Sequence, residues 1–211
     1  MARRTKAEAE QTRHSLLDAA ETLFLRQGVS RTSLHEIAQE AGTTRGAIYW
    51  HFKDKADLFN AMMDRVTLPL EHTLQEAGRP RGPGDDALRQ LLQAFMDALH
   101  ATVHDPQTRR VFHIAIHKVE YVDELQAVAD RRLEIMRGVM KVTEQAMEHS
   151  ARSQSLVLPI PAATAARGLH MLIDGLITYW LMEPDAFDLE ESGRATLTHY
   201  LCGLGFSRSL L

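Results

Sequence analysis

The side chains best suited to chemistry lie in residues 43–55, "TTRGAIYWHFKDK", which set a tyrosine, a tryptophan and a histidine side by side. Only Ile48 and Phe52 in this stretch share the i, i+4 spacing of a helical face that is turned to a core. Tyr49 and Trp50 are therefore left without an interior to fill. Large amphipathic rings on the outside of a short helix indicate a recognition surface. The alternative is that they only cover the edge of the core.

The chemistry that fits this stretch is contact with double-stranded DNA. Arg45 can donate a bidentate pair of hydrogen bonds to O6 and N7 of guanine. Gly46 has no side chain, so it allows the backbone to approach the duplex closely. Tyr49 can pack on a thymine methyl group or reach a phosphate, and His51 and Lys55 suit phosphates.

These side chains need a short helix held against two others, and the flanking sequence predicts both. Residues 15–24 carry one apolar helical stripe, and residues 33–42 open with a capping box. Two short helices joined by a tight turn, here 42–44, and packed on a longer helix form a helix-turn-helix, whose second helix enters the major groove. Ser33 and Thr44 would stand at helix N-termini, where a hydroxyl and free N–H groups favour a phosphate.

Composition supports a DNA-binding protein only through the distribution of charge. The net charge of −4 argues weakly against a nucleic-acid partner, but residues 1–55 carry nine Lys/Arg against seven Asp/Glu. The rest of the chain carries 15 against 21. A basic N-terminal piece on an acidic body suits local phosphate contact. One cysteine, no secretory signal and no membrane-length apolar run predict a cytoplasmic protein without a membrane partner.

Beyond this head the periodicity predicts an all-α fold with no convincing strand. The stretch 78–86, "GRPRGPGDD", is the clearest linker. We expect a DNA-binding head over residues 1–54 and a body over 55–211, with helix 55–77 as the connector between them. The remaining helices are expected at about 86–104, 107–118, 123–150, 161–183 and 189–204.

Residues 31–59, "RTSLHEIAQEAGTTRGAIYWHFKDKADLF", resemble the DNA-binding head of the TetR/AcrR family of bacterial repressors. The match covers the turn glycine, the Tyr-x-His-Phe end of the recognition helix and the lysine that follows. Residues 117–125 and 174–189 resemble the AcrR-like branch, which controls multidrug efflux pumps. The resemblance implies a nine-helix fold, a homodimer on a palindromic operator, and repression relieved by an apolar small molecule. The expected DNA-binding residues are Ser33, Thr44, Arg45, Gly46, Tyr49, Trp50, His51 and Lys55.

A ligand site in the body is expected around Asp174, a carboxylate within the largely apolar run "HMLIDGLITYWLM". The residues alone also allow a solvated or hydrogen-bonded row with His170 and Thr178, but the family resemblance implies that Asp174 lines a drug pocket. Such a pocket needs apolar walls and a few polar anchors. The predicted walls are Val66, Leu70, Met96, Leu99, Phe112, Ile116, Met140, Met171 and Trp180, with His72 and Asp174 as anchors.

The last two long helices are the predicted dimer interface. Gly168 and Gly175 lie seven residues apart, and glycines at that spacing allow two helices to approach closely. Leu169, Leu172 and Tyr179 lie near the same face. Two such helices from each subunit would form a four-helix interface. The alternative is that both glycines pack inside one subunit.

Histidine spacing leaves a second hypothesis open. His100 with His104, and His113 with His117, are i, i+4 pairs, so each pair faces one way, as two metal ligands must. A metal-responsive regulator and a ligand-independent DNA-binding regulator therefore remain as alternatives. No cysteine cluster or HExxH motif supports a metal site, so no bound metal is predicted. No P-loop, GxSxG or dinucleotide fingerprint is present, so we predict no enzyme, no catalytic residue and no cofactor.

Overall fold

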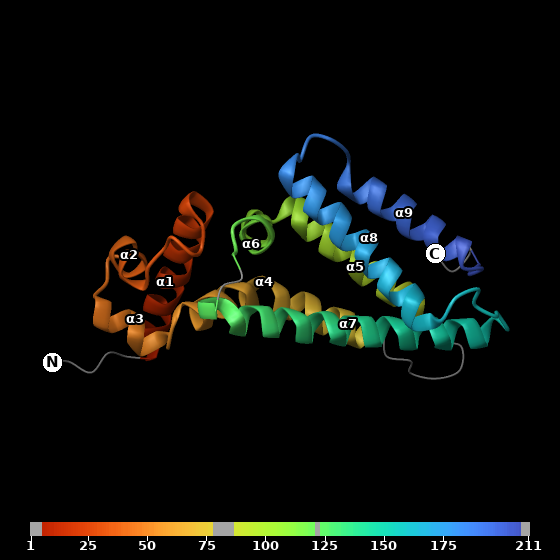
Figure 1. The fold of residues 1–211 in the computed structure, drawn as a ribbon, viewed down its shortest axis with the longest axis horizontal. Coiled ribbons are helices and arrows are strands. Elements are labelled where there is room, and N and C mark those ends of the chain that lie inside the picture. The colour runs from red at the N-terminus through yellow and green to blue at the C-terminus, as the bar shows by residue number, and fades with distance from the viewer. Residues whose placement is uncertain (1–5, 78–86, 121–122, 208–211) are drawn as a thin grey trace. The chain divides into compact units, whose positions relative to one another are not determined.

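In a computed structural model the described residues are 6–77, 87–120 and 123–207, and all regular structure within them is helical (Figure 1). The predicted all-α class is confirmed. The predicted linker 78–86 lies outside the described residues. The helices are α1 (Lys6–Gln27), α2 (Leu34–Glu40), α3 (Arg45–His51), α4 (Lys55–Ala77), α5 (Ala87–His104), α6 (Pro106–His117), the short 3-10 helix η1 (Asp123–Leu125), α7 (Gln126–Ser153), α8 (Ala162–Met182) and α9 (Leu189–Gly203).

The chain divides into two compact units. Unit 1 contains the chain up to Val66 together with Arg110–Arg132, and unit 2 contains Thr67–Arg109 and the chain from Leu133 onward. Helices α4, α6 and α7 contribute to both units. The head therefore shares a unit with most of α6 and the start of α7. This grouping differs from a division of the chain at residue 54, because packing joins segments that are far apart in sequence.

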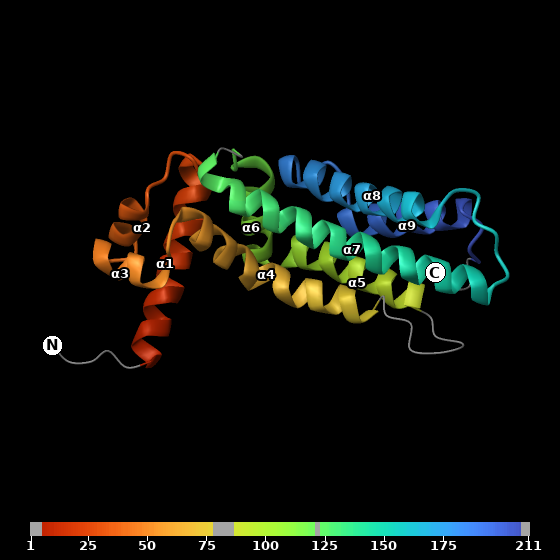
Figure 2. The same cartoon turned by 60° about the horizontal axis from the view of Figure 1, so that its bottom comes forward.

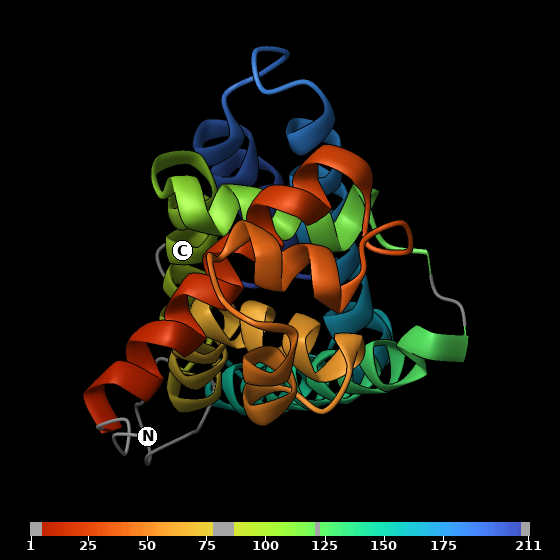
Figure 3. The same cartoon turned by 90° about the vertical axis from the view of Figure 1, so that its left-hand side faces the viewer.

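The core of unit 1 forms where α1, α2 and α3 pack on one another (Figure 3). The apolar stripe of α1 supplies Leu16 and Phe24, and α2 supplies Ile37, each fully buried. Helix α3 is anchored by Ile48, which is also fully buried, and by Phe52 directly after its last turn. Burying such side chains stabilises the unit by about 1.5–3 kcal/mol each, which is how a seven-residue helix remains folded.

Polar contacts attach α6 to the head within unit 1. Glu21 of α1 is buried, and its carboxylate accepts from Arg65 of α4 at 3.2 Å and from Arg110 of α6 at 3.5 Å. The N–H of Val29 donates to the carbonyl of Lys118 at 3.0 Å. Within unit 1, α6 and the residue that follows it are thus attached to the head by an ion pair and a backbone hydrogen bond.

Unit 2 is built on α5, α8 and α9, which pack on one another (Figure 2). Its core includes Leu91 and Leu99 of α5, Leu169 of α8 and Leu201 of α9, none of which has exposed surface. Across the described part of the chain, no helix combines the length and the apolar character that spanning a membrane would require.

Candidate functional site

The turn between α2 and α3 is fixed by local hydrogen bonds. Ser33 caps α2: its hydroxyl accepts from the N–H of Glu36 at 3.2 Å and donates to the Glu36 carboxylate at 2.7 Å. The hydrogen bonds that the Ser33 hydroxyl and backbone N–H donate to this carboxylate hold the pKa of the Glu36 carboxyl below its ordinary value. Gly42 has φ +64°, a conformation that favours glycine, and the Thr44 hydroxyl caps α3 by accepting from Ala47 N–H at 3.2 Å. The predicted helix-turn-helix is present.

Helix α3 turns most of its side chains to solvent. Arg45 and Gly46 in its first turn are exposed, Tyr49 is 50% exposed, and Trp50 is 73% exposed. The guanidinium of Arg45 lies 5.9 Å from the centre of the Tyr49 ring. His51 is half-buried and meets the Trp50 ring edge-on. The rings are held outward because Ile48 alone points into the core.

A polar hollow lies beside α3 in unit 1. It brings together Ser33 of the α2 cap and Tyr49 of α3, two of the predicted DNA contacts. It also contains two exposed cations that the sequence prediction missed, Arg31 and Lys53. In the sequence, the only indication that Arg31 and Lys53 could contact DNA was their position beside the helix-turn-helix motif. The full lining is Ser30, Arg31, Thr32, Ser33, Leu34, Tyr49, Lys53, Asp54, Lys55 and Glu124.

The prediction that Lys55 binds a phosphate needs correction. Its side chain is only 6% exposed. Its ammonium group donates to the carbonyls of Ser30 at 3.4 Å and Thr32 at 3.2 Å, and it lies 3.0 Å from the Glu124 carboxylate. An ammonium group enclosed by three acceptors is not free to meet DNA, so Lys55 fixes the segment between α1 and α2. Lys53 is the exposed lysine of the pair.

The predicted pocket residues fall in both compact units. Val66 lies in the core of unit 1, and Phe112 and Ile116 are partly buried in the same unit. The other eight predicted pocket residues belong to unit 2. There, Met96, Leu99 and Trp180 are buried, Leu70, Met140 and Asp174 are partly buried, and His72 and Met171 are exposed.

Two of the buried unit 2 residues have clear packing roles. Leu99 fills the space above Gly193 of α9, where a Cβ atom would lie 2.2 Å from its Cδ1. The guanidinium of Arg109 lies 5.0 Å above the ring of Trp180 and donates to the carbonyl of Thr102 at 3.4 Å. Leu99 and Trp180 therefore stabilise the core of unit 2 whether or not they also touch a ligand.

Asp174 has a histidine neighbour on its own helix. Nε2 of His170 lies 3.6 Å from Oδ2 of Asp174, with the side chains 12% and 39% exposed. Both ring nitrogens of His170 are buried, and among the described residues neither has a hydrogen-bond partner. A buried imidazole without a hydrogen-bond partner is costly unless water or a ligand supplies one. His170 is thus a candidate polar anchor that the sequence prediction did not select, although its i, i+4 spacing from Asp174 was visible.

An apolar groove follows α8 and α9 on the surface of unit 2. The rings of Tyr179 and Phe187 stack with their centres 5.8 Å apart, and Met171 is 46% exposed beside them. Met171 therefore lies on an outer face of unit 2, and its role as a pocket wall stays a prediction. The lining is Met171, Leu172, Gly175, Leu176, Tyr179, Phe187, Ser192 and Thr196.

The two glycines of α8 have different environments. A Cβ atom on Gly168 would lie 2.2 Å from the hydroxyl oxygen of Tyr200, which donates to the carbonyl of Ala165 at 3.0 Å. Gly168 thus allows α9 to pack on α8 inside one subunit, which corrects its prediction as an interface residue. A Cβ atom on Gly175 would meet no described atom within 4 Å, and Gly175 lies in the exposed groove.

Known families match this arrangement over most of the chain. Residues 16–62 match the tetR family of bacterial regulatory proteins. Residues 86–206 match the C-terminal region of MAATS-type transcriptional repressors. The HTH-type transcriptional regulator AcrR of Shigella flexneri is 38% identical over 194 residues, which cover 92% of this chain and 89% of AcrR.

Solved structures of similar repressors share the fold. NalD, the secondary repressor of the MexAB-OprM multidrug efflux pump in Pseudomonas aeruginosa, is 36% identical with a TM-score of 0.84, over 94% of this chain and 98% of NalD. SmeT in complex with triclosan is 27% identical with a TM-score of 0.81, over 92% of this chain and 91% of SmeT. SmeT represses the SmeDEF multidrug efflux pump of Stenotrophomonas maltophilia.

The chain therefore belongs to the TetR family of bacterial transcriptional regulators. Members of this family are DNA-binding regulators and not enzymes, so the prediction of a non-enzymatic protein is confirmed by this membership.

Proposed function

We propose that this protein is a cytoplasmic repressor of a multidrug efflux operon, released from a palindromic operator by apolar small molecules. The observation that carries the DNA-binding part is the outward face of α3, where Arg45, Gly46 and Tyr49 are exposed around one buried anchor, Ile48. The efflux part is supported by the relatives AcrR, NalD and SmeT, of which NalD and SmeT are repressors of efflux pumps.

The proposed DNA contacts divide into base readout and phosphate contact. Arg45 begins α3 and Tyr49 lies one turn later on it, and α3 holds the place of the helix that enters a major groove in helix-turn-helix proteins, so both read base edges. The exposed cation Lys53 replaces Lys55 as a phosphate ligand, because Lys55 is enclosed. The remaining phosphate and backbone contacts are Ser33, Thr44, Gly46, Trp50 and His51.

The proposed dimer forms through the apolar groove of α8 and α9. Its large side chains, Met171, Tyr179 and Phe187, line a face that also has space at Gly175. Exposed apolar surface of this kind marks an interaction site. A two-fold axis through these helices gives a dimer with two heads, which matches a palindrome read in successive major grooves.

The proposed release mechanism is a shift between two populations of the repressor. His170 and Asp174 act as polar anchors for a largely apolar ligand, and the triclosan complex of SmeT supports an aromatic, apolar inducer class. Because α6 is bonded to the head at Val29 and Glu21, a ligand that moves α6 would also move the head. A hundredfold loss of operator occupancy needs about 2.7 kcal/mol of differential ligand affinity.

Replacing Arg45 with alanine tests the base-reading role. The variant should lose about 1–3 kcal/mol of operator affinity and discriminate less between operator variants, because a bidentate contact to guanine is lost. Binding would be measured by fluorescence anisotropy on the operator and on single-base variants. Equal weakening on every sequence would show that Arg45 touches only phosphate.

One observation favours a second candidate function, that of a metal-responsive regulator. The His100–His104 pair meets a carboxylate, Glu190, in unit 2.

A further inference from the structure

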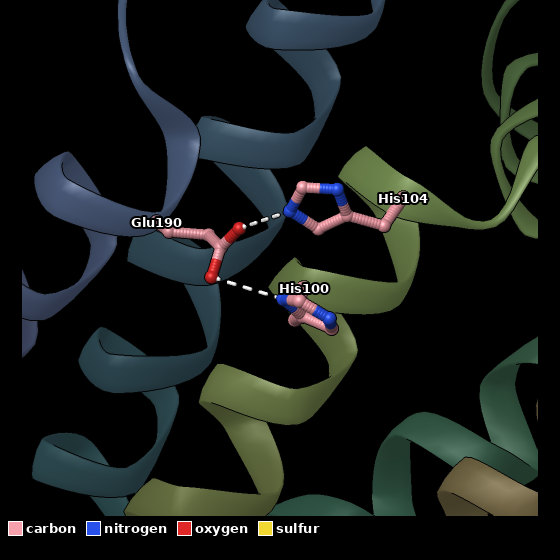
Figure 4. Close-up of side chains that lie close together, drawn as sticks. All are labelled: His100, His104 and Glu190. Atoms are coloured by element: carbon pink, nitrogen blue, oxygen red, sulfur yellow. Dashed lines mark hydrogen bonds and ion pairs between the residues drawn. The ribbon is translucent and has the colours of Figure 1, made fainter.

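Three polar side chains converge on the surface of unit 2. His100 and His104 lie one turn apart on α5, and Glu190 lies in the first turn of α9 (Figure 4). Nδ1 of His100 is 3.1 Å from one carboxylate oxygen of Glu190, and Nε2 of His104 is 2.7 Å from the other. Figure 4 shows both rings turning a nitrogen toward the carboxylate. The convergence joins residues that are 86 positions apart.

Helix packing positions this cluster firmly. Gly193 lies one turn beyond Glu190 on α9 and is buried against Leu99, the neighbour of His100 on α5. The absence of a side chain at Gly193 sets the close approach of the two helices. The side chain of Asp188 caps α9 by accepting from the N–H of Glu191 at 2.8 Å, which fixes the turn that carries Glu190. The three groups therefore project from helices and not from loops.

The donor set suits a first-row transition-metal ion. Two imidazole nitrogens and one carboxylate oxygen are the protein ligands of many zinc sites that keep a fourth position open. In a tetrahedral site with metal–ligand distances of 2.0–2.2 Å, ligand atoms lie about 3.3 Å apart. The three ligand atoms here all lie within 4.8 Å of one another, so small side-chain rotations bring them to that spacing.

The exposure of the cluster also suits a cation from solution. His100 and His104 are 61% and 55% exposed, so an ion from solution can reach them.

We propose that His100, His104 and Glu190 bind one divalent transition-metal ion of the zinc class per chain, with the fourth position taken by water. The ion replaces the hydrogen bonds between the rings and the carboxylate with three coordination bonds. It thereby ties α5 to the start of α9 and stabilises the folded protein, because binding to the native state alone shifts the folding equilibrium. The site is independent of the proposed DNA contacts.

The test uses the full-length protein without a histidine tag, freed of metal by a chelator. Zn²⁺ is titrated by calorimetry, and Co²⁺ by its visible absorption, which reports tetrahedral coordination. We expect one ion per chain. At a hundredfold excess of free Zn²⁺ over its dissociation constant, the unfolding midpoint should rise by about 5–10 °C.

Two variants and one control identify the ligands. Glu190→Gln and His104→Gln should each weaken Zn²⁺ binding by at least about tenfold, since even the loss of an outer-shell partner has such an effect. His113→Gln alters the other i, i+4 pair, whose rings lie 5.1 Å apart on α6, and should bind Zn²⁺ as the unchanged protein does.

Two results would overturn the proposal. The first is no Zn²⁺ or Co²⁺ binding by the unchanged protein. The second is equal binding by the unchanged protein, Glu190→Gln and His104→Gln, which would place the ion elsewhere. If the three side chains form only a hydrogen-bonded tie, Glu190→Gln would lower the unfolding midpoint, but Zn²⁺ would raise it in neither protein.

Discussion

Helices α3 and α8 both expose large side chains, but their neighbours differ in chemistry. On α3, the exposed Tyr49 lies near Arg45 and lines a hollow that also contains Arg31 and Lys53. On α8, the exposed Tyr179 and Met171 lie among Leu172, Leu176 and Phe187. Aromatic rings among cations suit a polyanion, whereas rings among aliphatic side chains suit another protein surface. Exposure alone does not distinguish the two sites, but the surrounding residues do.

The largest expected effect comes from removing the anchor of α3. Ile48→Ala should destabilise unit 1 by about 2–5 kcal/mol, because Ile48 is fully buried and its loss leaves a cavity. The measurement is chemical denaturation followed by circular dichroism. Tyr49→Ala is the matched control on the next residue. It should change stability by less than about 0.5 kcal/mol while reducing DNA affinity.

Substitutions of the two lysines after α3 should have different effects: one should lower stability, and the other should change DNA binding. Lys55→Ala should cost about 1–3 kcal/mol of stability, because the carbonyls of Ser30 and Thr32 lose their donor. Lys53→Ala should leave stability unchanged and lower the salt dependence of operator binding by about one counterion. Denaturation and anisotropy at several salt concentrations check both. The opposite pattern would return Lys55 to the DNA contacts.

The two glycines of α8 provide a smaller but sharper test of the second face. Gly168→Ala should destabilise the subunit by about 1–3 kcal/mol, since the new methyl group meets the Tyr200 hydroxyl. Gly175→Ala has free space within the subunit and should stabilise the helix by up to about 1 kcal/mol. If Gly175 lies in the dimer interface, the same change weakens dimerisation, which analytical ultracentrifugation measures. A dimer unaffected by Gly175→Ala would place the interface elsewhere.

The smallest expected effect concerns the cap of α2. The pKa of Glu36 is lowered from 4.5 by hydrogen bonds from Ser33. The folded state therefore binds the proton less tightly than the unfolded state. This contribution to stability is complete above pH 4.5 and is lost as the pH falls through the lowered pKa. Glu36→Gln should lose stability at pH 7, and its difference in stability from the unchanged protein should shrink as the pH falls below 4.5. A constant difference between the two proteins would exclude this contribution.

Sequence reasoning succeeded where the relevant contacts are local. The cap at Thr44, the turn at Gly42 and the anchor Ile48 all lie within seven residues of one another, so a short motif specifies the recognition helix. Lys55 is different, because two of its acceptors lie 23 and 25 residues upstream and the third is Glu124. A short sequence motif cannot indicate that the Lys55 ammonium group is enclosed by acceptors so distant in the sequence.

In unit 2, contacts between distant segments were even harder to predict from local sequence patterns. Gly168 and Gly175 look alike in the sequence, and only the position of Tyr200 on α9 shows which of them faces inward. The His100–His104 pair was visible as a pattern, but its carboxylate partner lies on a helix 86 residues later. Packing between distant segments decides both cases, and it is not encoded in local spacing.

The most direct test of the account is fluorescence anisotropy of labelled DNA from immediately upstream of this protein's own gene. The protein is titrated at two salt concentrations, and a panel of apolar drugs is then added. We predict salt-sensitive, sequence-selective binding that Arg45→Ala weakens and at least one drug reverses. Selective binding that no drug reverses would contradict the ligand-responsive part. If neither this DNA nor any sequence recovered from a random pool binds selectively, the assignment of α3 as a recognition helix would be wrong.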